Sequence, residues 1–108
     1  MGTNTVVASG DNFDTIINGE TPVLVDFWAA WCGPCRAMEA PLEEIAGEHS
    51  AMLSVAKLNV DENPQISMDY RVMSIPTMIV FKGGQEAKRL VGARSKAQLV
   101  AELGEYLA

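Results

Sequence analysis

The chain has 108 residues, of which 48% are hydrophobic and 20% charged, and its formal net charge is −6. This is the length and composition of one folded domain, which we place at residues 1–108, and it excludes a disordered or collagen-like chain. The acidic balance argues against nucleic acid or an anionic membrane as a partner, because phosphate is bound by clustered positive charge. With no apolar run near the roughly 18 residues of a membrane span and no signal-peptide pattern, we expect a soluble cytoplasmic protein.

Strand-like and helical patterns alternate along the chain. Phe13, Ile16 and Ile17 recur at helical spacing after Asp11, a residue of the capping type, and Gly19 is expected to end this first helix. The predicted strands lie at Thr5–Ala8, Val23–Ala29, Met52–Val60, Thr77–Lys82 and Glu86–Val91.

Three further helices are predicted. The second helix is marked by an apolar stripe formed by Met38, Leu42, Ile45 and Ala46. Acidic residues occupy its other positions, and we interpret them, Glu39 included, as a solvated face. The third helix is expected to begin at Asn63-Pro64, and the last at Ser95, whose spacing from Gln98 has the form of a capping box.

The order of these elements predicts the fold class. Gly83-Gly84 separates the last two strands and is typical of a hairpin turn. The resulting order, β-α-β-α-β-α-β-β-α, predicts an α/β fold in which helices join parallel strands and an antiparallel pair closes the sheet.

The chain offers few ligands for a metal ion or cluster. Its only cysteines are Cys32 and Cys35, whereas structural zinc sites and iron–sulfur clusters are held by about four ligands. We interpret the methionines, among them Met38, Met73 and Met78, as packing residues. We therefore expect neither a structural zinc site nor an iron–sulfur cluster.

The two cysteines lie in the segment Trp31–Cys35, between a predicted strand and a predicted helix. A helix N-terminus presents unpaired N–H groups and the positive end of the helix dipole, which stabilise a thiolate. The two-residue spacing lets the sulfurs meet across the first helical turn, so it permits a reversible disulfide. By position, we expect Cys32 to be the exposed nucleophile and Cys35 the buried thiol that resolves the mixed disulfide. The alternatives are half of a metal site or two inert thiols.

The residues between the cysteines bear on the direction of electron flow. Gly33 and Pro34 bring neither positive charge nor a side-chain donor to a thiolate. A group of that kind would stabilise the reduced form and make the pair more oxidising. We therefore expect the pair to lie toward the reducing end of the scale.

Two charged residues interrupt apolar strands. Asp26 lies in the segment Pro22–Trp28, which is apolar at both parities, as central strands are. A buried carboxyl group has a raised pKa and is a candidate to take the proton of Cys35; the alternative is a strand-end carboxylate that caps the next loop. Lys57 either pairs with Asp26, if their strands are neighbours, or is an exposed edge lysine.

Pro76 precedes the predicted strand at Thr77–Lys82. It either begins that strand or forms a cis peptide bond with Ile75, and the local sequence leaves both readings open.

Several segments together resemble the thioredoxin family: Val25–Cys35, Lys57–Asp61, Ser74–Thr77, Phe81–Gly84 and Val91–Ala93. They cover essentially the whole chain in the order of the family. The resemblance implies a thioredoxin fold, with a central five-stranded mixed sheet flanked by four helices. It also implies a general protein thiol–disulfide oxidoreductase that reduces disulfide-containing proteins, holds no cofactor, and is reduced in turn by a thioredoxin reductase that uses NADPH.

The resemblance further implies roles for single residues. Cys32 would be the nucleophile and Cys35 the resolving thiol, Asp26 would help to deprotonate Cys35, Lys57 would lie beside Asp26 and tune it, and Pro76 would be cis. A flat, mostly apolar surface for substrates would be formed by Trp31, Gly33, Pro34, Ile75, Pro76, Gly92 and Ala93. We expect the protein to be a monomer.

One position departs from the family pattern. The family usually places a helix-kinking proline five residues after the second cysteine, but here Ala40 takes that place and Pro41 follows. Pro41 is expected to remove the hydrogen bond to the Ala37 carbonyl and to kink the helix there. A shift of one residue turns the kink by about 100° around the helix axis.

Two other functions compete with this interpretation. One is a subunit of the same fold that binds a partner without redox turnover; the presence of both cysteines, Asp26 and Lys57 argues against it. The other is a disulfide oxidase of an oxidising compartment, which the Gly33-Pro34 pair disfavours.

Overall fold

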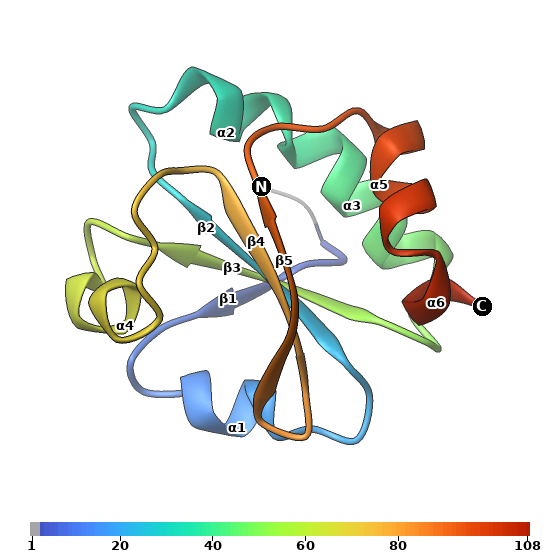
Figure 1. Ribbon diagram of the computed structural model, residues 1–108, viewed down its shortest axis with the longest axis horizontal. Helices are drawn as coiled ribbons and strands as arrows, with labels where there is room; N and C mark the ends of the chain where they lie inside the picture. Colours follow the sequence, from blue (N-terminus) through green and yellow to red (C-terminus); the bar gives the residue numbers. More distant parts are fainter. Residues whose placement is uncertain (1–2) are drawn as a thin grey trace.

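A computed structural model describes residues 3–108 as one sheet between two layers of helices (Figure 1). The strands are Val6–Ala8 (β1), Val23–Trp28 (β2), Ser54–Asn59 (β3), Thr77–Lys82 (β4) and Gln85–Val91 (β5). The helices are Phe13–Ile17 (α1), Gly33–Ala37 (α2), Glu39–Glu48 (α3), Pro64–Asp69 (α4), Lys96–Glu102 (α5) and Gly104–Leu107 (α6). Every predicted strand is present, with ends displaced by at most 2 residues.

The sheet is mixed, and its strand order is β1-β3-β2-β4-β5. β1 and β2 both pair with β3 in parallel, whereas β4 is antiparallel to β2 and to β5. The β4–β5 hairpin turns at Gly83 and Gly84, whose φ angles of +61° and +81° lie in the region that favours glycine. β2 is therefore the central strand, and the segment that follows it begins at the middle of the sheet.

Each face of the sheet has its own core. Alternate residues of β2 point to opposite faces, with Leu24 on one side and Val25 and Phe27 on the other. The apolar stripe of α3 packs on the Leu24 face together with α5, whereas α1 and α4 cover the opposite face (Figure 1). Asp26 has the same parity as Leu24, so its side chain points to the α3 face.

Six helical segments form four helical units. Met38 ends α2 and begins α3, and Leu103 has the same place between α5 and α6. Pro41 is the third residue of α3 and has no N–H to donate to the Ala37 carbonyl. The predicted interruption near Ala37 is thus present as a break at Met38, and the family's four flanking helices are confirmed.

The helix caps agree with the sequence pattern in one case and differ in another. The capping box before α5 is present: Ser95 Oγ accepts a hydrogen bond from the Gln98 N–H at 3.2 Å, and Gln98 Oε1 accepts one from the Ser95 N–H at 2.9 Å. At α1, however, Asn12 rather than Asp11 holds the cap position. The Asn12 side chain accepts a hydrogen bond from the Ser9 N–H at 2.8 Å, and so stabilises the preceding turn instead of the helix.

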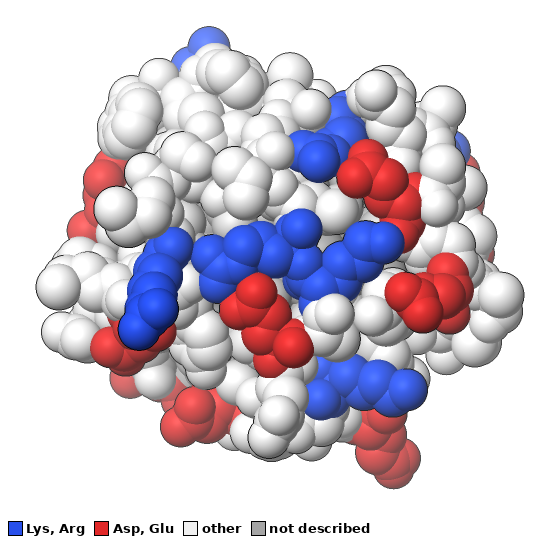
Figure 2. Space-filling model, in the orientation of Figure 1, with Lys and Arg blue, Asp and Glu red and all other residues white. Residues whose placement is uncertain are grey.

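Charged side chains on the β5 face alternate in sign. Figure 2 shows a band of basic side chains bordered by acidic ones. Arg89 pairs with Glu86 at 2.8 Å and Arg94 with Glu102 at 3.1 Å. Exposed pairs of this kind contribute about 0–1 kcal/mol each. Separately, none of the helices within residues 3–108 has the length and apolar character needed to cross a membrane.

Candidate active site

The two cysteines form a disulfide at the start of α2, close to the carboxyl end of the central strand. Cys32 is the N-cap of α2 and Cys35 its third residue, and their Cα atoms are 5.2 Å apart. The sulfur of Cys32 accepts a hydrogen bond from the Cys35 N–H at 3.2 Å. Pro34, between them, sits at an early helical position where its missing N–H leaves no hydrogen bond unmade. The start of α2 therefore directs the Cys35 N–H group, rather than a side chain, at the sulfur of Cys32, as the sequence pattern predicts.

The exposure of Cys32 differs from the prediction. Cys32 is 5% exposed and Cys35 is 2% exposed, so the prediction of an exposed nucleophile is wrong for the disulfide form. The reason is tertiary: the sulfur of Cys32 lies 3.9 Å from the carbonyl oxygen of Ile75, which a distant loop brings against the disulfide. Trp28, Val60 and Ile75 pack around the pair. A substrate must therefore fit closely to reach this sulfur.

Two other predicted segments join the cysteines at this edge. The Ile75–Pro76 peptide bond is cis. The carbonyl oxygen of Pro76 accepts a hydrogen bond from the Gly92 N–H at 2.9 Å, and Gly92 has a φ of +99°, which favours glycine. Gly33, Pro34 and Ala93 are exposed. Ile75 and Gly92 are half-buried, and Pro76 is buried. The residues predicted to form a docking surface therefore come from three loops, of which the Ile75–Pro76 loop contacts both of the others.

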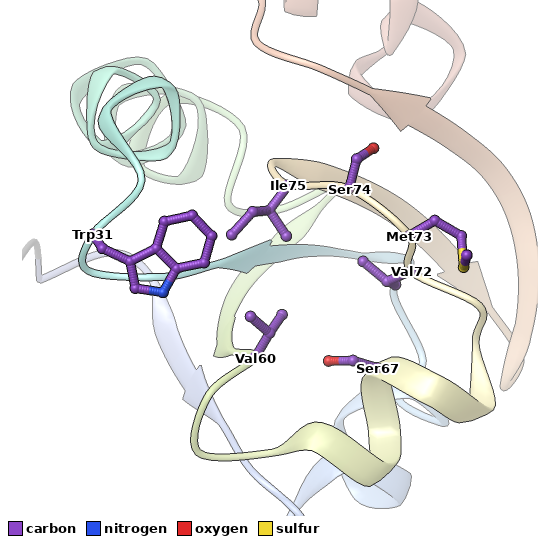
Figure 3. Close-up of a pocket in the computed structure, with 7 residues that line it drawn as sticks. All are labelled: Trp31, Val60, Ser67, Val72, Met73, Ser74 and Ile75. Carbon is purple, nitrogen blue, oxygen red and sulfur yellow. The ribbon is translucent and has the colours of Figure 1, made fainter.

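A hollow of about 360 Å³ opens beside the disulfide (Figure 3). Its lining is formed by Trp31, Val60, Ser67, Val72, Met73, Ser74 and Ile75. Trp31 is 69% exposed, and its indole N–H donates to Asp61 Oδ2 at 2.8 Å, which fixes the ring at the rim. Of this lining, the sequence pattern identifies only Trp31 and Ile75.

Met73 corrects the interpretation of the methionines. Met38 and Met78 are buried, as predicted for packing residues, but Met73 is 91% exposed. It lies at the hollow instead of in a core. Its place two residues before Ile75 was the one available signal, because a residue next to a predicted docking loop tends to share its surface.

Asp26 is completely buried in β2, the strand that leads to the cysteines. It is 0% exposed, and neither carboxylate oxygen has a hydrogen-bond partner among residues 3–108. Burial raises its pKa to about 7; the positive charge of Lys57 opposes that rise and the negative charge of Glu39 adds to it. The alternative interpretation of Asp26 as a loop-capping carboxylate is wrong, because such a cap would accept backbone hydrogen bonds.

Lys57 is the register partner of Asp26 on β3. It is 7% exposed and lies on a strand with neighbours on both sides, so the alternative of an exposed edge lysine is wrong. Its ammonium group lies 3.8 Å from Glu39 Oε1 and 4.8 Å from the centre of the Trp28 ring. The sequence pattern identifies neither neighbour, since Glu39 fits a solvated helix face equally well.

Side chains able to bind a metal are not gathered anywhere in the described chain. Within residues 3–108, no group of three or more His, Cys, Asp or Glu side chains is arranged to hold an ion. At the site itself, the two sulfurs are bonded to each other. The site therefore combines a disulfide at a helix start with a buried carboxyl group on the preceding strand.

Comparisons with known proteins agree on one family. The Thioredoxin family model matches residues 4–105. The chain is 53% identical over 103 residues to a thioredoxin of Alicyclobacillus acidocaldarius subsp. acidocaldarius, covering 95% of this chain and 98% of that protein. It is 52% identical over 106 residues to a thioredoxin of Mycolicibacterium smegmatis, covering 95% of each. A bifunctional thioredoxin reductase/thioredoxin of Mycobacterium leprae is 49% identical over 106 residues, which cover 98% of this chain and 23% of that protein.

Proposed function

The chain belongs to the thioredoxin family, and from that premise we propose how its residues carry out disulfide reduction. It is a thiol–disulfide oxidoreductase, a protein-disulfide reductase that a thioredoxin reductase recycles with electrons from NADPH. The observation that carries the mechanism is the Cys32–Cys35 disulfide at the start of α2, which follows β2, the strand that holds the buried Asp26.

The first step forms a mixed disulfide. In the reduced protein, the Cys32 thiolate attacks one sulfur of a substrate disulfide, the substrate S–S bond breaks, and the second substrate sulfur leaves as a thiolate that takes up a proton. The Cys35 N–H, which points at the Cys32 sulfur, supports Cys32 as the nucleophile because a hydrogen bond to the charged form favours that form.

The second step resolves the mixed disulfide. The Cys35 thiol gives its proton to the Asp26 carboxylate, and its sulfur then attacks the Cys32 sulfur. The bond between Cys32 and the substrate breaks, the substrate leaves as a thiolate, and the Cys32–Cys35 disulfide remains. Two electrons have passed to the substrate. Asp26 suits this role because its pKa of about 7 lets it both accept and release a proton near neutral pH.

Substrates dock at the loops that surround the sulfur. The proposed docking surface consists of Trp31, Gly33, Pro34, Ile75, Pro76, Gly92 and Ala93. Its support is the exposed Trp31 ring, the hollow beside it, and the closeness of the Ile75 carbonyl to Cys32. An extended segment of substrate backbone would lie against Ile75 while its disulfide meets Cys32.

The partners follow from the same chemistry. Disulfide-containing proteins are the substrates and a thioredoxin reductase is the electron donor; the bifunctional relative, whose name joins both activities in one protein, supports the second pairing. We further propose that the protein acts as a single-domain cytoplasmic monomer without a membrane or nucleic-acid partner. Its formal charge of −6 supports the monomer and the absence of a phosphate-bearing partner, because like charges keep small proteins apart from one another and from phosphate.

A role as a binding subunit without turnover is not favoured. Such a subunit would not need a disulfide joined across the first helical turn, nor an unpartnered carboxyl group on the preceding strand. A buried carboxyl without a partner destabilises the fold when ionised, so its presence is explained better by proton transfer than by structure.

Reduction of insulin disulfides, driven by NADPH and a thioredoxin reductase, tests this mechanism. Cys32→Ser is expected to abolish turnover because it removes the nucleophile. Asp26→Ala is expected to keep formation of the mixed disulfide but to slow its release, by about 10-fold or more, as for the loss of a general base.

The two variants separate the parts of the mechanism. Turnover by Cys32→Ser at the parental rate would refute the assignment of the nucleophile. Release of the mixed disulfide by Asp26→Ala at the parental rate would refute the proton-transfer role and leave the nucleophile unaffected.

A further inference from the structure

Three charged side chains from three elements lie near one another on the α3 face of the sheet: Asp26 from β2, Lys57 from β3 and Glu39 from α3. Asp26 and Lys57 are register partners on adjacent strands and point to the same face. Yet within residues 3–108 the one ion pair of Lys57 is with Glu39, at 3.8 Å, and Asp26 has no hydrogen-bond partner. Lys57 therefore lies beside the buried carboxyl of Asp26 but forms its ion pair with the carboxylate of Glu39.

Glu39 is well placed to hold Lys57. It is the first residue of α3, where the helix dipole favours a negative charge. Its side chain is 47% exposed, whereas that of Lys57 is 8% exposed, so the carboxylate keeps much of its hydration while it neutralises the buried ammonium. The break at Met38 makes Glu39 the first residue of α3, and its Oε1 reaches Lys57 on β3.

Trp28 fixes the other side of the ammonium. The nitrogen lies 4.8 Å from the centre of the Trp28 ring, within the range of a cation–π contact. Lys57 and Trp28 also line a hollow of about 220 Å³ together with Val7, Ala8, Asn59 and Glu62. Glu62 is the acidic residue in this lining, but among the described residues it forms no ion pair with Lys57.

We propose that Glu39 is a positioning residue for the resolving step. Its ion pair holds the Lys57 ammonium and so leaves the Asp26 carboxyl free of a charged partner. This proposal rests on the proposed role of Asp26. A carboxyl paired with an ammonium holds its negative charge too firmly to exchange a proton at neutral pH. The raised pKa of Asp26, to which the charge of Glu39 contributes and which Lys57 opposes, agrees with this arrangement.

Few charged groups surround Asp26, so the effect of Glu39 on its titration can be measured separately. Lys57 faces it from β3 and Glu39 from α3, while its register partner on β4 is the apolar Met78. On α2, the Arg36 guanidinium donates to the Ala30 carbonyl at 3.3 Å, in the loop before the helix. In the reduced protein, the thiol of Cys35 is the remaining titratable group from α2.

Glu39→Gln is the direct test. Two quantities are measured in the variant: the titration of the Asp26 carboxyl carbon by NMR in the reduced protein, and the pH profile for release of a mixed disulfide. Both midpoints are expected to move to lower pH by about 0.5–1 unit, because Lys57 becomes free to pair with Asp26 and a repelling charge is lost. Glu44→Gln is the matched control: it removes the same charge from α3, where Glu44 pairs with Lys96 at 3.0 Å, and should move neither midpoint.

A second background shows whether Glu39 acts through Lys57. Lys57→Met keeps an unbranched side chain that is one atom shorter and removes its charge. In this background, Glu39→Gln is expected to shift the Asp26 midpoint by less than half as much, since only direct repulsion is then lost. An equal shift in both backgrounds would overturn the positioning role.

The remaining outcomes separate this proposal from the role of Asp26. If Glu39→Gln leaves the Asp26 titration unchanged while Asp26→Ala still slows release, the proposal for Glu39 fails and the role of Asp26 stands. If the titration moves but the release profile does not, Asp26 is not the proton acceptor, and both proposals fail together.

Discussion

Asp26 shows how a single residue can be costly to the fold and useful to the chemistry. Moving an ionised carboxylate out of water without a partner costs several kcal/mol, and the group responds by keeping its proton. Its burial and unpartnered oxygens account for the pKa of about 7. The same property that makes it a proton carrier therefore makes the stability of the protein depend on pH.

The raised pKa of Asp26 predicts that the free energy of unfolding falls between about pH 4 and pH 7. In that interval the unfolded chain has released the Asp26 proton while the folded protein still holds it, so the free energy of unfolding falls as the pH rises. The shift from 3.8 to about 7 corresponds to a total of about 4 kcal/mol, fully lost above pH 7. Urea unfolding at a series of pH values measures this slope.

The variant Asp26→Asn is expected to lack that slope and to be more stable than the parent at pH 8, because a neutral side chain of the same shape replaces a buried charge. Asp11→Asn, at an exposed position, should keep the parental slope. Parallel curves for the parent and Asp26→Asn would contradict the explanation.

The helical elements depend on local signals to different degrees. α5 begins with a complete capping box, which satisfies two backbone N–H groups within four residues. α3 instead begins at the break between Ala37 and Glu39, where Pro41 removes a hydrogen bond, and packing of Leu42 and Ile45 holds it in place. The start of α5 is therefore determined by local sequence, whereas the start of α3 depends on packing in the core.

The cap of α5 gives a prediction at this scale. Ser95→Ala removes the acceptor for the Gln98 N–H and is expected to reduce the free energy of unfolding by about 1 kcal/mol. Chemical denaturation of the variant measures the loss. Ser50→Ala, at an exposed position in a turn, serves as the control and should change stability by less than about 0.5 kcal/mol. Equal effects of the two changes would mean that the cap contributes nothing specific.

In the whole molecule, the redox site lies apart from the two cores. One core joins β2, β3 and β4 to α3 and α5, and the other joins the opposite face to α1 and α4. The cysteines belong to a third, small cluster at the carboxyl end of β2. This separation lets the site change its covalent state while the sheet and helices keep their packing.

Reduction of the disulfide is therefore expected to leave the fold intact. The disulfide joins residues only 3 positions apart, and closing so short a loop stabilises a protein by about 2 kcal/mol at most. Denaturant unfolding with and without a thiol reductant measures the difference. Leu42→Ala, in the core under α3, should lose about 2–5 kcal/mol and provides the comparison. Loss of cooperative unfolding on reduction alone would show that the site is part of the core.

The elements and the reacting atoms could be predicted from sequence alone, because both depend on neighbouring residues. Periodicity located the strands, the glycine pair placed the hairpin, and the segment Trp31–Cys35 identified the disulfide at a helix start. An acidic residue within an apolar strand was enough to single out Asp26.

Which side chains meet could not be predicted and became visible in the folded molecule. Ile75 covers the sulfur of Cys32, Met73 reaches the hollow instead of a core, and Lys57 pairs with Glu39 although Asp26 is its register partner. Each of these contacts joins elements far apart in the chain, and side-chain direction at such contacts is set by packing and by competition between charges. Local spacing carries no information about that competition, so a residue such as Glu39 looks the same in sequence whether it faces solvent or holds a buried lysine.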